Sequence, residues 1–190
     1  MRDAEAVSQD RDAIARCLEG DREAFGELLD RHQGTVFNIA YRMTGSRQDA
    51  EDLAQDAFVR AYSALGEFRG ESSFRTWICQ IATRLCIDHL RSRKETRELR
   101  EDLAAPGEGS DWTGRMADGE IVAEAIRALP PHYRAVVVLR HLEHRSYQEI
   151  ADTLDLPLAT VKTHIRRARE RLRERLAPLL RAAETKETET

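Results

Sequence analysis

The chain has 190 residues and a formal net charge of −4 at pH 7, with 41% hydrophobic and 34% charged residues. This length suits one domain or two small ones, and 6% aromatic residues with 10 glycines are few for an all-β fold with many turns. No apolar run reaches the roughly 20 residues that span a bilayer, and the charged N-terminus is unlike a signal peptide. We therefore expect a cytoplasmic, mainly helical protein that does not insert into membranes.

The N-terminal part of the sequence predicts two helices. Residues 9–21 predict a short helix that ends near Gly20, and Asp21 can cap a longer helix that ends near Gly45. Apolar residues supply one side of this longer helix, namely Phe25, Leu28, Leu29, Val36, Phe37, Ile39, Ala40 and Met43.

Two further helices follow in the N-terminal half. Ser46, with Asp49 three residues later, resembles a capping box that starts the third helix. That helix carries one continuous apolar stripe at helical spacing, formed by Ala50, Leu53, Ala54, Ala57, Phe58, Ala61, Tyr62 and Leu65. A loop over 67–73 then leads into a fourth predicted helix over 74–94.

A change of composition after Arg100 indicates a linker. Residues 101–120 contain Gly, Pro, Ser and acidic residues without a sustained apolar stripe. Helices resume at Ile121, and Pro130–Pro131 can start the next one. The sequence therefore predicts an all-α fold of two small helical domains. Their expected bounds are 1–95 and 120–182, with a flexible linker over 96–119 and a disordered tail over 183–190.

The C-terminal half contains the pattern of a helix-turn-helix. Ser146 and Glu149 form a capping box that opens a short helix to about Leu154. A tight turn follows, and then a helix with seven basic residues between 159 and 177. In a helix-turn-helix the second helix lies in the DNA major groove. Local rather than net charge governs docking, so an acidic chain can still bind DNA there; the alternative is a solvated charged helix or a partner-binding surface.

Three segments resemble one known family. LPPHYRAVVVLRHLEHRSYQEIADTLDLPLATVKTHIRRARERL, at 129–172, strongly resembles the promoter-reading domain of extracytoplasmic-function (ECF, group IV) sigma factors of the sigma-70 family. DAEDLAQDAFVRAYSAL, at 49–65, and FRGESSFRTWICQIATRLCIDHLRSRK, at 68–94, resemble its core-binding and promoter-melting segments. The resemblance covers about residues 10–180. It implies a non-catalytic specificity subunit that binds core RNA polymerase, directs it to promoters and promotes DNA melting.

The resemblance also implies partners. They are core RNA polymerase, through the clamp helices of its largest subunit and its β flap, promoter DNA, and an anti-sigma factor. Carboxylates on the third predicted helix would meet Arg or Lys of the polymerase. The residues expected to bind core polymerase are Asp49, Asp52, Gln55 and Asp56.

Two sets of DNA-binding residues follow from the same resemblance. The loop after the third helix would receive a base flipped from the minus-ten element. Residues expected at the minus-ten element are Phe68, Arg69, Arg75, Thr83, Arg84 and Asp88. Residues expected at the minus-35 element are Lys162, Thr163, Arg166, Arg167 and Arg169. We assign Trp77 to core packing, because apolar residues lie at neighbouring helical positions.

The sequence departs from the family pattern at three positions. Ala159 and His144 stand where the family has Gly, and His164 stands where a basic residue is common. Ala159 makes the turn slightly less permissive. His164 removes a fixed charge at neutral pH, which argues against a phosphate contact at that position.

The sequence leaves two alternative functions. Cys79, Cys86 and His89 could share one helix face around a metal, but three ligands without a fourth make a weak site. Cysteines at such positions are more often buried thiols than metal ligands. Together with Cys17, they do not suggest a disulfide framework. We expect no metal, no cofactor and no catalytic residue. A freestanding helix-turn-helix regulator is the second alternative, and it leaves the predicted docking helix unexplained.

Overall fold

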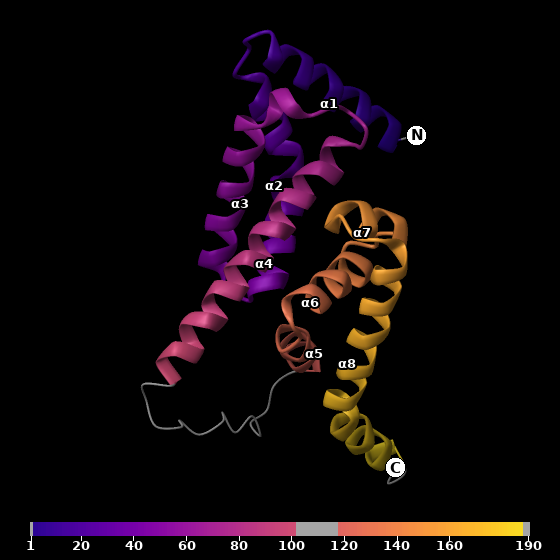
Figure 1. The fold of residues 1–190 in the computed structure, drawn as a ribbon. Helices are drawn as coiled ribbons and strands as arrows, with labels where there is room; N and C mark the ends of the chain where they lie inside the picture. Colours follow the sequence, from indigo (N-terminus) through magenta and orange to yellow (C-terminus); the bar gives the residue numbers. More distant parts are fainter. Residues whose placement is uncertain (1, 102–117, 188–190) are drawn as a thin grey trace.

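The structure is a computed structural model that describes residues 2–101 and 118–187, and these residues form helices and no strands (Figure 1). This agrees with the all-α fold predicted from the sequence. The N-terminal half contains α1 (Arg2–Leu18), α2 (Ala24–Thr44), α3 (Arg47–Ser63) and α4 (Phe74–Glu101). The C-terminal half contains α5 (Asp118–Arg127), α6 (Pro131–Val137), α7 (Tyr147–Leu154) and α8 (Leu158–Glu187).

In the N-terminal half, α2, α3 and α4 pack side by side, and α1 crosses one end of them (Figure 1). Local signals set the ends of these helices as predicted. Gly45, at φ 73°, ends α2 in the left-handed region, where Gly has no steric penalty. The Ser46 hydroxyl then accepts a hydrogen bond from the Asp49 N–H at 3.2 Å, which caps α3. The predicted stripe of α3 faces inward, with Ala50, Ala57 and Ala61 fully buried.

In the C-terminal half, α7 and α8 form the predicted helix-turn-helix. The capping box of α7 is complete, because Ser146 and Glu149 each accept a hydrogen bond from the other's backbone N–H, at 3.2 and 2.7 Å. Asp155 ends α7 in the left-handed region, at φ 53°. One further α helix, α6, begins at Pro131 and continues into a π-helical turn over Val138–Leu142.

Several helices are longer than predicted. α1 begins at Arg2, seven residues before the expected start at Gln9, and α4 continues to Glu101 rather than ending at Lys94. Residues 95–101 are rich in Glu, Arg and Leu, which favour helix. α8 likewise continues to Glu187, beyond the expected domain bound at 182. Most of the predicted linker, with Trp112, lies outside the described residues.

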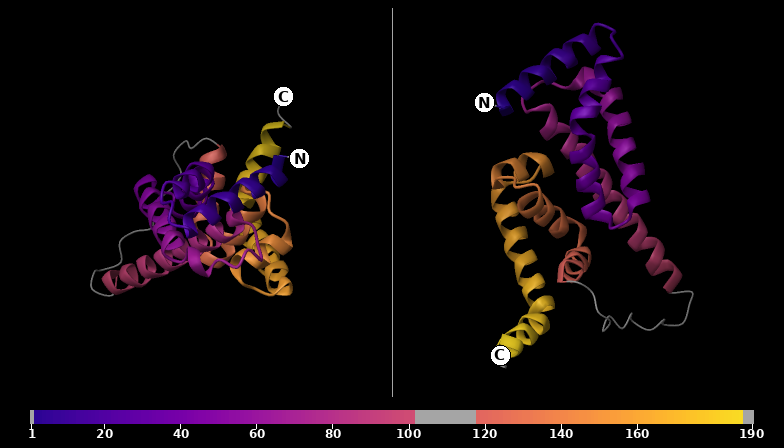
Figure 2. Two further views of the ribbon diagram at one scale, coloured as in Figure 1. Left: turned by 90° about the horizontal axis from the view of Figure 1, so that it is seen from above. Right: turned by 180° about the vertical axis from the view of Figure 1, so that it is seen from behind.

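The two halves pack against each other and share one continuous apolar core. α4 contacts α6 and α7, and α2 contacts α5 and α6, and the right view of Figure 2 shows the two halves facing each other. Five consecutive residues, Ala135 to Leu139, are each at most 3% exposed. A helix with one covered face buries only a stripe of its surface, so this segment is covered on all sides, by α8 and by the N-terminal half.

One arginine joins the two halves through main-chain atoms. The buried guanidinium of Arg134 donates to the main-chain oxygens of Met43, Arg127 and Leu129. These oxygens lie at the ends of α2 and α5, where carbonyls lack partners within their own helix. Burial lowers the pKa of Arg134 to about 10, so the side chain stays protonated at neutral pH.

Among the helices described here, none combines the length and apolar character needed to cross a membrane.

Candidate nucleic-acid and polymerase interfaces

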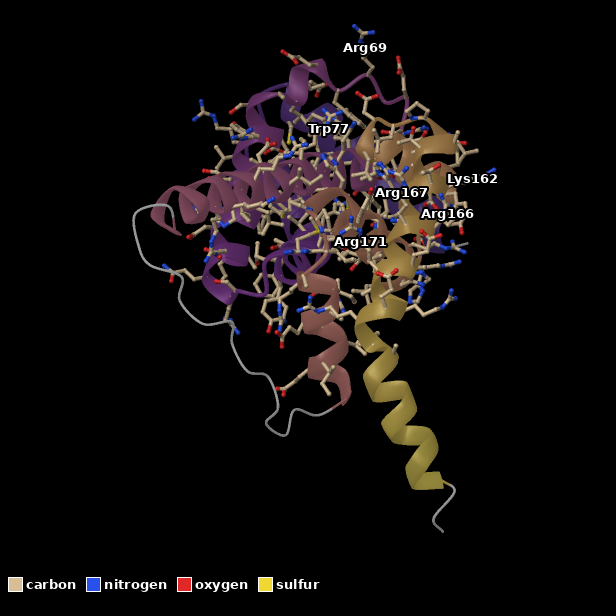
Figure 3. The ribbon with its side chains drawn as sticks, turned by 60° about the horizontal axis from the view of Figure 1, so that its bottom comes forward. Arg69, Trp77, Lys162, Arg166, Arg167 and Arg171 are labelled. Atoms are coloured by element: carbon tan, nitrogen blue, oxygen red, sulfur yellow. The ribbon has the colours of Figure 1, made fainter. Side chains whose placement is uncertain are left out.

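The basic helix α8 has a buried side and a charged outer side. Val161 and Ala168 are fully buried, whereas Lys162, Arg166 and Arg169 are exposed. Figure 3 shows Lys162 and Arg166 pointing outward, away from the rest of the molecule. A helix held by its inner face and cationic on its outer face can enter a major groove and meet phosphates and guanine edges.

Two other arginines of α8 contact Tyr133 of α6. Arg167 donates to the Tyr133 hydroxyl at 3.4 Å, and the Arg171 guanidinium lies 5.5 Å from the centre of the Tyr133 ring. Both are therefore on the side of α8 that faces α6, and Figure 3 shows them inward of Lys162 and Arg166. The Thr163 hydroxyl donates to the Ala159 carbonyl at 2.9 Å, within the helix. Of the predicted minus-35 residues, Lys162, Arg166 and Arg169 therefore share one open face, while Arg167 lies at its inner border.

The structure shows the environments of the three residues that depart from the family pattern. His164 packs against Tyr133 with 5.2 Å between ring centroids, and burial, followed by Arg167, lowers its pKa. It is therefore neutral at neutral pH, as the sequence analysis expected. Ala159 lies in the right-handed helix α8, so it does not restrict the turn. In the described parts of the chain, the non-glycine residues with positive φ are His144 and Asp155.

The predicted polymerase face lies on α3 beside an apolar groove. Asp52, Gln55 and Asp56 are exposed along α3. The groove between α2 and α3 has a volume of about 760 Å³. Its lining is mostly apolar and comprises Phe25, Leu29, Gln33, Gly34, Phe37, Glu51, Ala54, Gln55, Phe58, Val59, Tyr62 and Ser63. Val59 and Tyr62 are 58% and 44% exposed, and such large exposed apolar groups are typical of interaction sites. Tyr62 was predicted to lie in the buried stripe of α3 but is exposed at this groove, which has no signal in the sequence.

Asp49 has a different environment from the other three residues predicted on this face. Its carboxylate pairs with Arg93 at 2.6 Å and lies 3.6 Å from His89, both on α4. Its side chain is only 23% exposed. Asp49 therefore joins α3 to α4, and the exposed carboxylates of this face are Asp52 and Asp56.

The predicted minus-ten loop has an aromatic base and charged tips. Phe68 lies 5.0 Å from Trp77 and 6.2 Å from Phe74, measured between ring centroids. Trp77 packs within this cluster, as predicted. Arg69 and Arg75 are exposed, and Figure 3 shows Arg69 pointing away from the molecule. The loop thus offers cations to a phosphate backbone, while Phe68 is half-buried.

Of the predicted minus-ten edge of α4, defined as Thr83, Arg84 and Asp88, only Thr83 is covered, whereas Arg84 and Asp88 are exposed. Thr83 is fully buried, and its hydroxyl has no hydrogen-bond partner. Arg84 pairs with Asp155 at 3.2 Å, and only Asp88 is exposed without such a contact to α7. A strand of DNA cannot reach Thr83 in this arrangement. The sequence could not indicate this, because the covering residues lie about 70 positions away.

The side chains considered for a metal have other surroundings. Burial raises the pKa of the Cys86 thiol to about 12 and also raises that of Cys79, so both thiols are protonated. His89 lies beside Asp49 instead. Within the described ranges, no three metal-binding side chains come together.

Comparison with known proteins identifies both halves. Residues 28–96 match the family model for Sigma-70 region 2, and residues 119–172 match the model for Sigma-70, region 4. The ECF RNA polymerase sigma factor SigW of Bacillus subtilis is 35% identical over 179 residues, covering 87% of this chain and 96% of the relative. The RNA polymerase sigma-H factor of Pseudomonas aeruginosa is 34% identical over 188 residues, covering 92% and 97%.

Solved structures share the fold. CnrH, solved in complex with the cytosolic domain of CnrY, is 30% identical with a TM-score of 0.63, covering 92% of this chain and 98% of that chain. The sigma factor RpoE from Bartonella quintana, solved with the anti-sigma factor NepR, has a TM-score of 0.61 at 24% identity, covering 80% and 96%.

Proposed function

The chain belongs to the extracytoplasmic-function RNA polymerase sigma factors of the sigma-70 family. From this we propose which partner each of its surfaces binds. In the proposal, α3 docks on core polymerase, the 68–75 loop and α4 hold the opened minus-ten strand, and α8 reads the minus-35 element. The observation that carries it is the presence of two matched regions, in order, on one chain. The chain is then a non-catalytic specificity subunit.

Reading of the minus-35 element by α8 is supported by its exposed cations. Lys162, Arg166 and Arg169 are exposed on α8, and Figure 3 shows Lys162 and Arg166 pointing away from the rest of the molecule. Arg can pair bidentately with guanine, whereas Lys acts as a point charge on phosphate. Arg166 pairs with Glu170 at 2.6 Å, an exposed pair of small net stability, so DNA can displace it at little cost.

Docking on core polymerase is supported by the composition of the α2–α3 surface. An exposed apolar groove lies beside the carboxylates of Asp52 and Asp56. The best complement is an amphipathic helix with apolar residues in the groove and Arg or Lys at its border. Clamp helices of the largest polymerase subunit are such a partner. Binding there would bury Val59 and Tyr62, which otherwise cost free energy in water.

Holding of the minus-ten strand is supported by the loop. Arg69 and Arg75 supply exposed cations, and the cluster of Phe68, Phe74 and Trp77 supplies a rigid base. Single-stranded DNA binding combines a cationic track with places where bases stack. On the minus-ten edge of α4, Arg84 and Asp88 are exposed and would extend this surface.

Two further protein contacts belong to the proposal. We place the β flap of core polymerase against the C-terminal domain, and an anti-sigma factor against the chain when it is inactive. The second is supported by CnrH, a relative of similar fold solved with the cytosolic domain of another protein. A freestanding regulator would use the helix-turn-helix alone, and the match of residues 28–96 to Sigma-70 region 2 does not favour it.

The test is dependence on core polymerase. Core enzyme would transcribe genomic DNA from the same bacterium with and without the chain. The transcription start sites would be identified by sequencing the transcripts. We expect a small set of start sites that core enzyme alone does not use. The matched control replaces Lys162, Arg166 and Arg169 together by Ala, which should remove those start sites. Identical start sites with and without the chain would overturn the proposal.

A further inference from the structure

Tyr133, near the start of α6, contacts three side chains of α8. The Arg167 guanidinium donates to the Tyr133 hydroxyl at 3.4 Å, and the Arg171 guanidinium lies 5.5 Å from the centre of the Tyr133 ring. The His164 ring packs edge-on against the same ring, with 5.2 Å between the centroids. These positions of α8 follow one another at intervals of three and four residues, so they share one flank of the helix. We call Tyr133, Arg167 and Arg171 together the Tyr133 cluster.

The positive charges of the Tyr133 cluster have no carboxylate to balance them. Among the described residues, neither Arg167 nor Arg171 forms an ion pair, and Glu170, which lies between them in the sequence, pairs with Arg166 at 2.6 Å. His164 adds no charge at neutral pH, because burial, followed by Arg167, lowers its pKa. Arg167 and Arg171 are both exposed, so the cluster presents two guanidinium groups to solvent.

The Tyr133 hydroxyl keeps a donor for an outside partner. A phenolic oxygen can accept a hydrogen bond while its own proton is donated. Arg167 uses the acceptor side, and no residue in the described part of the chain accepts the proton. Two guanidinium groups and one hydroxyl proton around a single ring form a donor set that fits an oxyanion such as a phosphate.

The Tyr133 cluster lies on a different flank of α8 from Lys162 and Arg166. Arg171 is five residues beyond Arg166, which is about 140° further around a helix with 3.6 residues per turn. Figure 3 shows Arg167 and Arg171 inward of Lys162 and Arg166. The DNA major groove is about 12 Å wide, close to the diameter of a helix with its side chains. A helix that fills the groove therefore has a sugar–phosphate backbone beside each flank.

We propose that the Tyr133 cluster binds a backbone phosphate of the promoter duplex, on the wall of the major groove that faces α6. This inference rests on the proposed reading of the minus-35 element by α8. Arg171 supplies a positive charge to the phosphate, and the Tyr133 proton donates to one of its oxygens. Arg167, held at the Tyr133 hydroxyl, lies between this phosphate and the base edges. Phosphate contacts fix the register of a protein on the duplex, so the cluster sets the position from which Arg166 reads bases.

The hydroxyl itself separates this role from one that only fastens α8 to α6. The contacts of the Tyr133 ring with His164 and Arg171 do not use the hydroxyl. The bond from Arg167, at 3.4 Å, is longer than the usual range of about 2.7–3.2 Å. Its loss should therefore change the stability of the fold very little, whereas loss of a donor to a phosphate should weaken DNA binding.

The first experiment measures binding of duplex DNA by the full-length chain assembled with core polymerase. The probe is a fluorescent duplex that carries the minus-35 element of a promoter found by the start-site mapping and ends before the minus-ten element, so melting does not contribute. Arg171→Ala should lower the affinity several-fold and reduce the slope of log affinity against log salt concentration by about one, as loss of one phosphate contact does. Arg22→Ala is the matched control, because it removes the same charge from an exposed position outside α8. Equal salt slopes for the two variants would overturn the proposal.

Tyr133→Phe tests the hydroxyl while keeping the ring. We expect the affinity to fall about three- to ten-fold, by the same factor for the promoter duplex and for a scrambled duplex, since a phosphate carries no sequence information. The salt slope should not change, because no charge is removed, and the unfolding temperature should match that of the wild-type chain. An effect confined to one base pair would show that the hydroxyl acts only by orienting Arg167 for base reading, and would overturn the phosphate contact.

The last experiment locates the phosphate. Uncharged methylphosphonates replace the phosphates of the duplex one at a time along both strands. The wild-type chain should lose affinity at one position where Arg171→Ala is insensitive, because that variant has already lost the contact. Arg166→Ala should remain sensitive at the same position. A scan in which Arg171→Ala responds like the wild-type chain at every position would overturn the proposal.

Failure of this inference can be told apart from failure of the proposed function. Equal binding of promoter and scrambled duplexes by the wild-type chain with core polymerase would overturn the reading of the minus-35 element by α8, and the phosphate site with it. A clear preference for the promoter duplex that both Tyr133→Phe and Arg171→Ala retain at wild-type affinity would overturn the phosphate site alone.

Discussion

The guanidinium of Arg134 donates to the main-chain oxygen of Met43, and so links α6 to the last turn of α2. The same guanidinium also donates to the main-chain oxygens of Arg127 and Leu129 at the end of α5. A planar fork with several donors can reach three carbonyls at once, which the ammonium group of Lys cannot match. Arg134 therefore acts as a cap for two helices from different halves of the chain.

We expect Arg134→Ala to destabilise the fold by about 3 kcal/mol or more, because it leaves buried carbonyls without donors. Arg134→Lys should recover only part of this loss. Thermal unfolding of both variants measures the effect. Arg173→Ala, on the exposed side of α8, is the control and should change stability by less than about 0.5 kcal/mol. Equal unfolding temperatures for the Ala variants would contradict the capping role.

His144→Gly should stabilise the chain. His144 lies at φ 54°, in the left-handed region, where a side chain costs roughly 1 kcal/mol that Gly avoids. The control is His141→Gly, in the π-helical turn, where Gly should cost about 0.5–1 kcal/mol through chain entropy. Chemical denaturation curves compare the two. A loss of stability in both variants would show that the backbone at His144 is unstrained.

Acidification should weaken the contact between the two halves. Burial, and then Arg91 and His164, lower the pKa of His132, which Asp88 raises only in part. His132 therefore binds a proton more readily in the unfolded chain than in the folded chain. The free energy of unfolding is highest above the unfolded pKa of His132, about 6.5, and decreases as the pH falls below it. His132→Gln should reduce the change in unfolding temperature between pH 7.5 and 5.5. An unchanged difference would exclude His132 as a source of the pH dependence.

Reversal of the exposed charges on α3 should weaken binding to core polymerase. Asp52→Lys with Asp56→Lys leaves the apolar stripe untouched, so circular dichroism should be unchanged while affinity falls by roughly 10-fold or more, since like charges at an interface repel. Asp12→Lys with Glu19→Lys makes the same charge change on exposed positions away from α3. Wild-type affinity of the α3 variant would place the docking surface elsewhere.

Arg166→Ala should reduce recognition of the minus-35 element. A bidentate base contact is worth about 1–3 kcal/mol, and its loss relaxes preference at that base pair. Lys162→Ala should weaken binding uniformly and lower the salt dependence, as loss of a phosphate contact does. Binding titrations on a set of single-base variants of the element separate these outcomes. Unchanged selectivity of Arg166→Ala would remove it from base reading.

Local signals in the sequence predicted the helices well. The capping pairs Ser46–Asp49 and Ser146–Glu149 and the stop at Gly45 involve residues within a few positions of one another, so their spacing is visible in the sequence. The buried side of α8, with Val161, follows from helical periodicity in the same way. Helix ends without such signals, at Glu101 and Glu187, were not predicted.

Contacts between distant segments could not be predicted in this way. The resemblance to the family placed Thr83 and Arg84 on a DNA-reading edge, and neither that resemblance nor helical periodicity reports which residues from another segment cover a helix. The covering residue Asp155 is 71 positions away. The pairing of Asp49 with Arg93 was missed for the same reason, at a separation of 44. The groove beside Val59 also depends on how two helices meet.

The left-handed backbone at Asp155 narrows the residues that this position can hold. Gly, Asn and Asp are the ones that adopt φ near 53° with little strain. Asp can change to Asn or to Gly through a single nucleotide substitution, and either change removes the charge that faces Arg84 while keeping the turn. Mutation of one codon can therefore remove this ion pair between α4 and the end of α7 and keep the turn, without altering any side chain on the outer face of α8.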